Sequence, residues 1–126
     1  MDRNTSKRLR VLLLVYAIVM GLYGLVHVVS PELVLARDPA IERVLGVAVV
    51  AFAFGAGLAY GEKVWARVRL VVVVLIVWMI LYTVTMAWGI LAGGIDPMAW
   101  APTALGAVFA VLLTAFYLRE MRTGRG

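Results

Sequence analysis

The sequence predicts an all-α integral membrane protein, a four-helix bundle whose helices run up, down, up and down. Three observations predict this fold. Of the 126 residues, 64% are hydrophobic and 15% are charged, whereas soluble domains are about 45–50% apolar and about 25% charged. The apolar residues form four uncharged runs, each close to the roughly 20 residues that a helix needs to cross a bilayer. Lys and Arg gather in alternate segments between those runs. This length accommodates a single transmembrane domain, 1–126.

The predicted spans are the uncharged runs 11–29, 44–60, 70–91 and 99–118. The first run follows a basic leader, as a signal peptide does, but it is longer than the apolar region of a typical signal peptide. We therefore expect a retained helix. Pro102 lies near the start of the fourth run, where it either kinks the helix or marks its beginning.

Two of the connections carry helix-start signals. Ser30-Pro31-Glu32 combines an N-cap residue, a proline at the first helical position and an acid in the first turn. This pattern predicts a short interfacial helix through 33–35, after the first span. Asp38-Pro39 and Asp96-Pro97 repeat the start signal before the second and fourth spans.

The distribution of cations predicts the orientation. Ten of the twelve Lys and Arg lie in the N-terminal tail, the second connection and the C-terminal tail, and the third connection has none. Basic segments stay on the cytoplasmic side during insertion, so we expect a multi-pass protein of the plasma (inner) membrane with both termini cytoplasmic. Because these cations would face anionic headgroups, the net charge of +5 does not indicate nucleic acid, and we expect no nucleic-acid partner.

The chemistry available inside the spans is limited. The four runs contain no Asp, Glu, Lys or Arg, whereas proton pumps and ion-coupled transporters need such groups near the midplane. The chain has no cysteine and one histidine, His27, which cannot alone build a multi-histidine metal site. We expect no catalytic residue, no metal site and no enzymatic activity, with a redox or quinone-linked subunit as the exception left open.

Small residues recur every four positions in two of the spans. Ala53, Gly57 and Gly61 form one such track, and Gly106 and Ala110 form another. Helices in membranes associate through close packing of small residues, so these tracks pack either inside the bundle or against a partner. The leading expectation is a non-enzymatic accessory or assembly subunit that docks through these faces in a homo-oligomer or larger membrane complex. An oligomeric pore at a subunit junction is a further alternative.

Two stripes of polar aromatic side chains are the candidate ligand site. They comprise Tyr16, Tyr23 and His27 of the first run, and Trp78, Tyr82 and Thr85 of the third. With Met20 between Tyr16 and Tyr23, spacings of three and four place each stripe on one face of its helix. If the stripes face each other, they suit an apolar ligand with a polar head, such as a quinone, a lipid or an isoprenoid. The alternative is that these side chains only bond to neighbouring helices. Apart from such a bound lipid or quinone, we expect no cofactor, and the expected partners include membrane lipids.

Several short motifs carry a resemblance to a known family. They are Gly21-Leu22-Tyr23-Gly24-Leu25, Ser30-Pro31-Glu32, Arg43-Val44-Leu45-Gly46 and the glycines at 55 and 57. In layout and in these motifs the chain resembles the small four-helix membrane proteins grouped as DoxX-like, whose named member is similar to a membrane subunit of a quinone-linked sulfur-oxidising enzyme. The resemblance implies a four-helix membrane fold, an accessory role and contact with quinone or lipid. It does not carry over the sulfur chemistry, because the chain has no cysteine.

Overall fold

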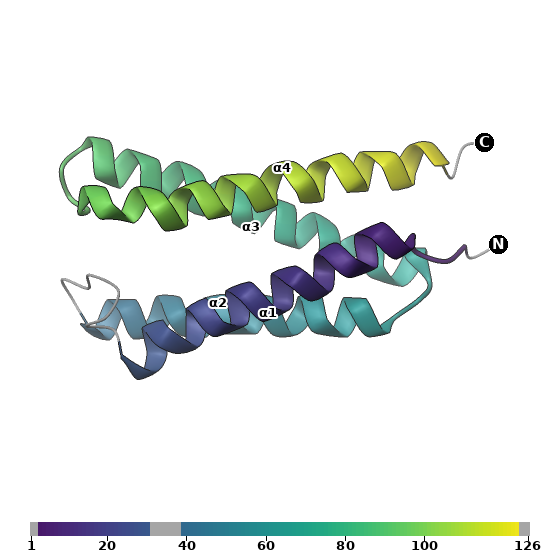
Figure 1. Cartoon of the computed structure of the whole chain (residues 1–126), viewed down its shortest axis with the longest axis horizontal. Coiled ribbons are helices and arrows are strands. Elements are labelled where there is room, and N and C mark those ends of the chain that lie inside the picture. The colour runs from purple at the N-terminus through teal and green to yellow at the C-terminus, as the bar shows by residue number, and fades with distance from the viewer. Residues whose placement is uncertain (1–2, 31–38, 124–126) are drawn as a thin grey trace.

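The computed structural model describes residues 3–30 and 39–123, and the predicted all-α class is confirmed over these ranges. Four long helices lie along the long axis of the molecule (Figure 1): α1 (Lys7–Val29), α2 (Pro39–Gly61), α3 (Trp65–Leu91) and α4 (Trp100–Thr123). Successive helices alternate in direction, so the start of α1, the end of α4 and the α2–α3 connection share one end of the molecule (Figure 1). We call it the terminal end.

All four helices are long and apolar enough to cross a membrane. At one or both ends, each helix extends beyond the uncharged run that predicted it; α1 begins at Lys7, for example, and α4 continues to Thr123. Lys, Arg and Glu are good helix formers, and long cationic side chains can reach the membrane interface from a helix end. Each uncharged run therefore marks the part of a helix that can lie in the hydrocarbon core of a membrane. The full helix is longer than that run.

The helix-start signal of the fourth span is confirmed, whereas Asp38, the capping residue predicted for the second span, lies outside the described residues. The Asp96 side chain accepts a hydrogen bond of 2.9 Å from the backbone N–H of Met98 and begins a 3-10 turn, η2 (Pro97–Ala99), that leads into α4. Pro102 consequently lies in the first turn of α4 and marks its beginning, where a missing N–H costs no helical hydrogen bond. Helix α2 begins at Pro39. The interfacial helix predicted at 33–35 lies outside the described residues.

The core forms where two helical hairpins meet. Helix α1 packs most extensively on α2, and α3 packs most extensively on α4 (Figure 1). The largest fully buried side chains recur at spacings of three and four along α1 and α3, and they include Leu9, Leu13, Tyr16 and Met20 of α1, and Val68, Val72, Leu75 and Met79 of α3. Many large apolar side chains on the other faces are exposed, with Val44, Phe54 and Leu70 among the most exposed. Such outer faces suit hydrocarbon rather than water.

Helices α1 and α2 cross at two glycines. A Cβ atom built on Gly46 would lie 2.7 Å from His27 Cβ and 2.8 Å from the Gly24 carbonyl oxygen. A Cβ atom on Gly24 would lie 3.0 Å from the Gly46 carbonyl oxygen. These contacts are with backbone or with the base of a side chain, which cannot rotate away. Glycine at both positions therefore allows the two backbones to approach this closely.

Candidate functional site

A groove on α3 brings together the three residues of the predicted α3 stripe. Trp78, Tyr82 and Thr85 line it, and the remaining lining residues are Leu45 of α2 and Leu81 and Met86 of α3. Its volume is about 260 Å³. We call it the α3 groove. No lining residue is acidic or basic, so the groove suits an uncharged and mainly apolar molecule.

Two residues of the predicted α1 stripe lie behind the groove. The hydroxyls of Tyr23 and Tyr82 are 3.2 Å apart, which joins α1 to α3 by a hydrogen bond. The buried His27 donates from Nδ1 to the backbone carbonyl of Tyr23 at 2.9 Å, and the rings of Tyr23 and His27 lie 4.3 Å apart. Tyr23 thus contacts a groove-lining residue through its hydroxyl and holds the His27 ring through its backbone carbonyl.

Tyr16, the third α1 residue, belongs to the core instead. Its ring meets Phe109 of α4 edge-on, with centroids 5.0 Å apart. Trp78 lies beside the Tyr16 hydroxyl, yet among the described residues neither Tyr16 Oη nor Trp78 Nε1 has a hydrogen-bond partner, although both atoms are buried. The Trp78 ring also stacks on Phe52, with centroids 4.5 Å apart. Trp78 is therefore held in place by two residues.

Thr85 is the groove-lining threonine, and its hydroxyl differs from that of two other threonines. The hydroxyls of Thr83 and Thr103 each donate to the carbonyl four residues earlier, at 2.7 Å. Within the described part of the chain, Thr85 forms no such bond; the residue is exposed and is one of those that line the groove. Thr83 and Thr103 therefore use nearby backbone carbonyls as partners, whereas the Thr85 hydroxyl can bond to a ligand.

The small residues divide between internal packing and open faces. Gly106 lies against Tyr82, where an added Cβ would come within 2.9 Å of the ring, and Ala110 is buried. Ala53 lies opposite Gly21 of α1, and Gly57 lies more loosely opposite Ala17. Around Gly61 an added Cβ would meet nothing within 4 Å, and the same is true of Gly55. The candidate docking residues thus mostly serve packing between helices, with open positions at Gly55 and Gly61.

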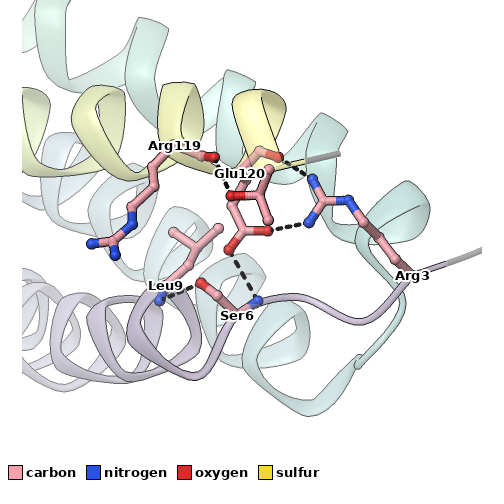
Figure 2. A network of polar contacts seen from close by, with 6 residues as sticks. Arg3, Ser6, Leu9, Arg119 and Glu120 are labelled. Atoms are coloured by element: carbon pink, nitrogen blue, oxygen red, sulfur yellow. Dashed lines mark hydrogen bonds and ion pairs between the residues drawn. The ribbon is translucent and has the colours of Figure 1, made fainter. Parts of the chain in front are cut away.

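Sequence reasoning missed a buried carboxylate at the terminal end (Figure 2). Glu120 of α4 is 3% exposed, and its Oε2 accepts from Arg3 Nη1 at 2.7 Å. Its Oε1 accepts from the Ser6 backbone N–H at 3.0 Å, at the start of α1, and Arg3 also donates to the Glu120 backbone carbonyl. The Arg3 guanidinium lies 5.4 Å above the Trp65 ring. Glu120 thereby ties the N-terminal segment to the end of α4.

A second acidic residue stabilises the α2–α3 connection. Glu62 Oε1 accepts from the Val64 N–H at 3.0 Å, and its Oε2 lies 3.3 Å from Arg67 Nη1. The hydrogen bond from Val64 is the main reason that the pKa of Glu62 is lowered. Next to this turn, the Thr5 N–H donates to the Lys63 carbonyl at 2.7 Å. The N-terminal segment is thus held by the connection as well as by Glu120.

The helices and their exposed apolar faces together support the class of multi-pass helical membrane protein. Comparison of the chain with protein-family models, curated proteins and solved structures finds no match. Among the described residues, no group of three or more His, Cys, Asp or Glu is placed to hold a metal ion.

Proposed function

We propose that the chain is a non-enzymatic integral membrane protein that binds a small apolar molecule with one hydrogen-bonding head in the α3 groove. Both termini are proposed to be cytoplasmic. Among the described residues, every Lys and Arg except Arg43 lies at the terminal end (Figure 1), and basic ends stay cytoplasmic. The observation that carries the binding proposal is that Thr85, an exposed residue whose hydroxyl bonds to no described residue, lines an apolar groove together with Trp78 and Tyr82.

The lining of the groove favours an uncharged ring or chain with a carbonyl or hydroxyl. Trp78 and Tyr82 offer aromatic surface, and Leu45, Leu81 and Met86 supply aliphatic and thioether surface. The Thr85 hydroxyl can donate to a carbonyl or accept from a hydroxyl. Since no charged group lines the groove, a quinone or an isoprenoid alcohol fits better than an acid or an amine. The resemblance to DoxX-like proteins also favours quinone contact.

Replacing Thr85 with valine is expected to weaken binding of a short-tailed benzoquinone by about 3- to 10-fold, the effect of losing one hydrogen bond. Valine keeps the shape of the side chain and removes only the hydroxyl. The measurement is quenching of tryptophan fluorescence by the quinone in mild detergent, repeated with an isoprenoid alcohol in competition. The matched control is Thr83→Val, because Thr83 already bonds to Met79. If the unmodified chain, Thr85→Val and Thr83→Val bound the quinone with equal affinity, the proposal would be contradicted.

A second candidate function is docking of a partner helix on the open face of α2. An added Cβ meets nothing within 4 Å at Gly55 or Gly61, and the neighbouring Phe54 and Leu58 are exposed. A small residue between large exposed apolar ones lets another helix approach closely. This face suits an accessory or assembly subunit.

Replacing Gly55 with leucine is expected to reduce association of the chain at least several-fold, because the larger side chain holds a docked helix away. Energy transfer between two labelled populations in lipid vesicles measures self-association, and co-purification from the native membrane measures association with other proteins. Val111→Leu, which enlarges an exposed side chain on α4, is the control. If Gly55→Leu associates as the unmodified chain does, the α2 face has no docking role.

A further inference from the structure

A second groove lies at the terminal end, where the start of α1 passes α4. Five α1 residues and one α4 residue line it: Lys7, Arg8, Val11, Leu12, Val15 and Phe116. Its volume is about 550 Å³, larger than that of the α3 groove. We call it the α1–α4 groove. It is separate from the α3 groove, with which it shares no lining residue.

The lining changes from cationic to apolar along α1. Lys7, Val11 and Val15 are spaced by four residues and therefore follow one stripe of the helix. Val15 lies eight positions after Lys7, which corresponds to a rise of about 12 Å along the helix. Val11 and Val15 are 48% and 43% exposed, while Leu12 is buried beneath them. The stripe thus begins with a cation and continues with apolar side chains. A membrane lipid has the same order, with a charged headgroup followed by an apolar acyl chain.

The two cations in this groove have no acidic partner among the described residues. Neither Lys7 nor Arg8 forms an ion pair there. The carboxylate of Glu120, on the same helix as Phe116, is already occupied by Arg3 and by the Ser6 N–H. The charges of Lys7 and Arg8 are therefore available to an anion that comes from outside the chain.

We propose that the α1–α4 groove binds an anionic phospholipid, with the lipid phosphate on Lys7 and Arg8 and one acyl chain along Val11, Val15 and Phe116. The charge selects an anionic headgroup, and the apolar wall selects a molecule that carries a chain. A soluble phosphate would satisfy only the first requirement. The lipid comes from the leaflet at the terminal end, where nearly all the described cations lie (Figure 1).

The test compares retention of phosphatidylglycerol and phosphatidylcholine by the full chain, measured by native mass spectrometry from mild detergent. The double variant Lys7→Gln/Arg8→Gln is expected to lose about 30-fold in affinity for phosphatidylglycerol, because each cation near an anionic surface contributes about a factor of five. Its weak retention of phosphatidylcholine should not change. The matched control, Lys63→Gln/Arg69→Gln, removes the same charge at the same end from two exposed residues outside the groove. It should retain phosphatidylglycerol as the unmodified chain does.

Two further arms separate a lipid site from a simple phosphate site. Val15→Trp, which fills the apolar wall and keeps both cations, should reduce retention of phosphatidylglycerol several-fold. Glycerol phosphate, the headgroup without chains, should not displace the lipid at millimolar concentration. The proposal is overturned if both double variants lose lipid equally, if phosphatidylcholine is retained as well as phosphatidylglycerol, or if glycerol phosphate competes. Retention by Val15→Trp equal to that of the unmodified chain would also overturn it.

Discussion

Replacing Gly46 with alanine is expected to destabilise the folded chain by about 2–3 kcal/mol, the upper part of the usual range for overpacking. The added Cβ would lie 2.7 Å from His27 Cβ and 2.8 Å from the Gly24 carbonyl oxygen. Neither atom can move by a change of rotamer, so the α1 and α2 backbones must separate. That separation would disturb Val49, which is buried one turn further along α2.

The measurement is unfolding by a denaturing detergent, followed by helical circular dichroism and tryptophan fluorescence. Gly55→Ala is the matched control on the same helix, because an added Cβ there meets nothing within 4 Å. Alanine is the better helix former by about 1 kcal/mol in water, so the control should be unchanged or slightly more stable. Only the Gly46 variant is expected to lose stability. Equal destabilisation of both variants would contradict the close α1–α2 crossing.

Replacing Arg3 with alanine is expected to destabilise the chain by about 2 kcal/mol, because it leaves the Glu120 carboxylate buried without its cation. Breaking a fully buried ion pair costs about 3–5 kcal/mol. The effect here is smaller because the Arg3 side chain is 32% exposed and solvent screens its charge, whereas Glu120 is 3% exposed. Glu120→Ala should cost less than Arg3→Ala, since the Arg3 guanidinium can turn into water when its partner is removed.

This asymmetry can be measured by the same unfolding experiment, with hydrogen exchange at Ser6 and Leu9 to report the start of α1. Faster exchange is expected at both N–H groups in Arg3→Ala. The control is Arg67→Ala, which breaks the exposed pair with Glu62 at the same end of the molecule and should have a much smaller effect. If Glu120→Ala lowered the free energy of unfolding more than Arg3→Ala, the unpaired buried carboxylate would not be the main cause of destabilisation in Arg3→Ala.

Local features of the sequence predicted the helices and part of the candidate site. The four apolar runs predicted four helices because hydropathy and length are properties of contiguous residues. Asp96-Pro97 predicted a helix start because its hydrogen bond reaches only to Met98. Trp78, Tyr82 and Thr85 share a groove because spacings of four and three place them on one face of one helix, whatever surrounds that helix.

Tertiary contacts decided which helix each face meets. Tyr16 lies beside Trp78, as facing stripes predict, but its ring also packs on Phe109 of α4, and this contact could not be predicted because it depends on the position of a third helix. Another such contact is the Gly24–Gly46 crossing, which periodicity cannot identify among many glycines. Likewise, nothing near Glu120 in the sequence identifies Arg3 as its partner, since 117 positions separate them.

The sequence alone therefore determined that the chain forms four apolar helices and which residues share a face of each. These properties follow from the chemistry of neighbouring residues and from a fixed helical geometry. The tertiary structure alone decided which glycines permit close approach, which carboxylate is buried and which side chains line each groove. Those outcomes depend on distances between helices, and such distances are set by packing among residues that lie far apart along the chain.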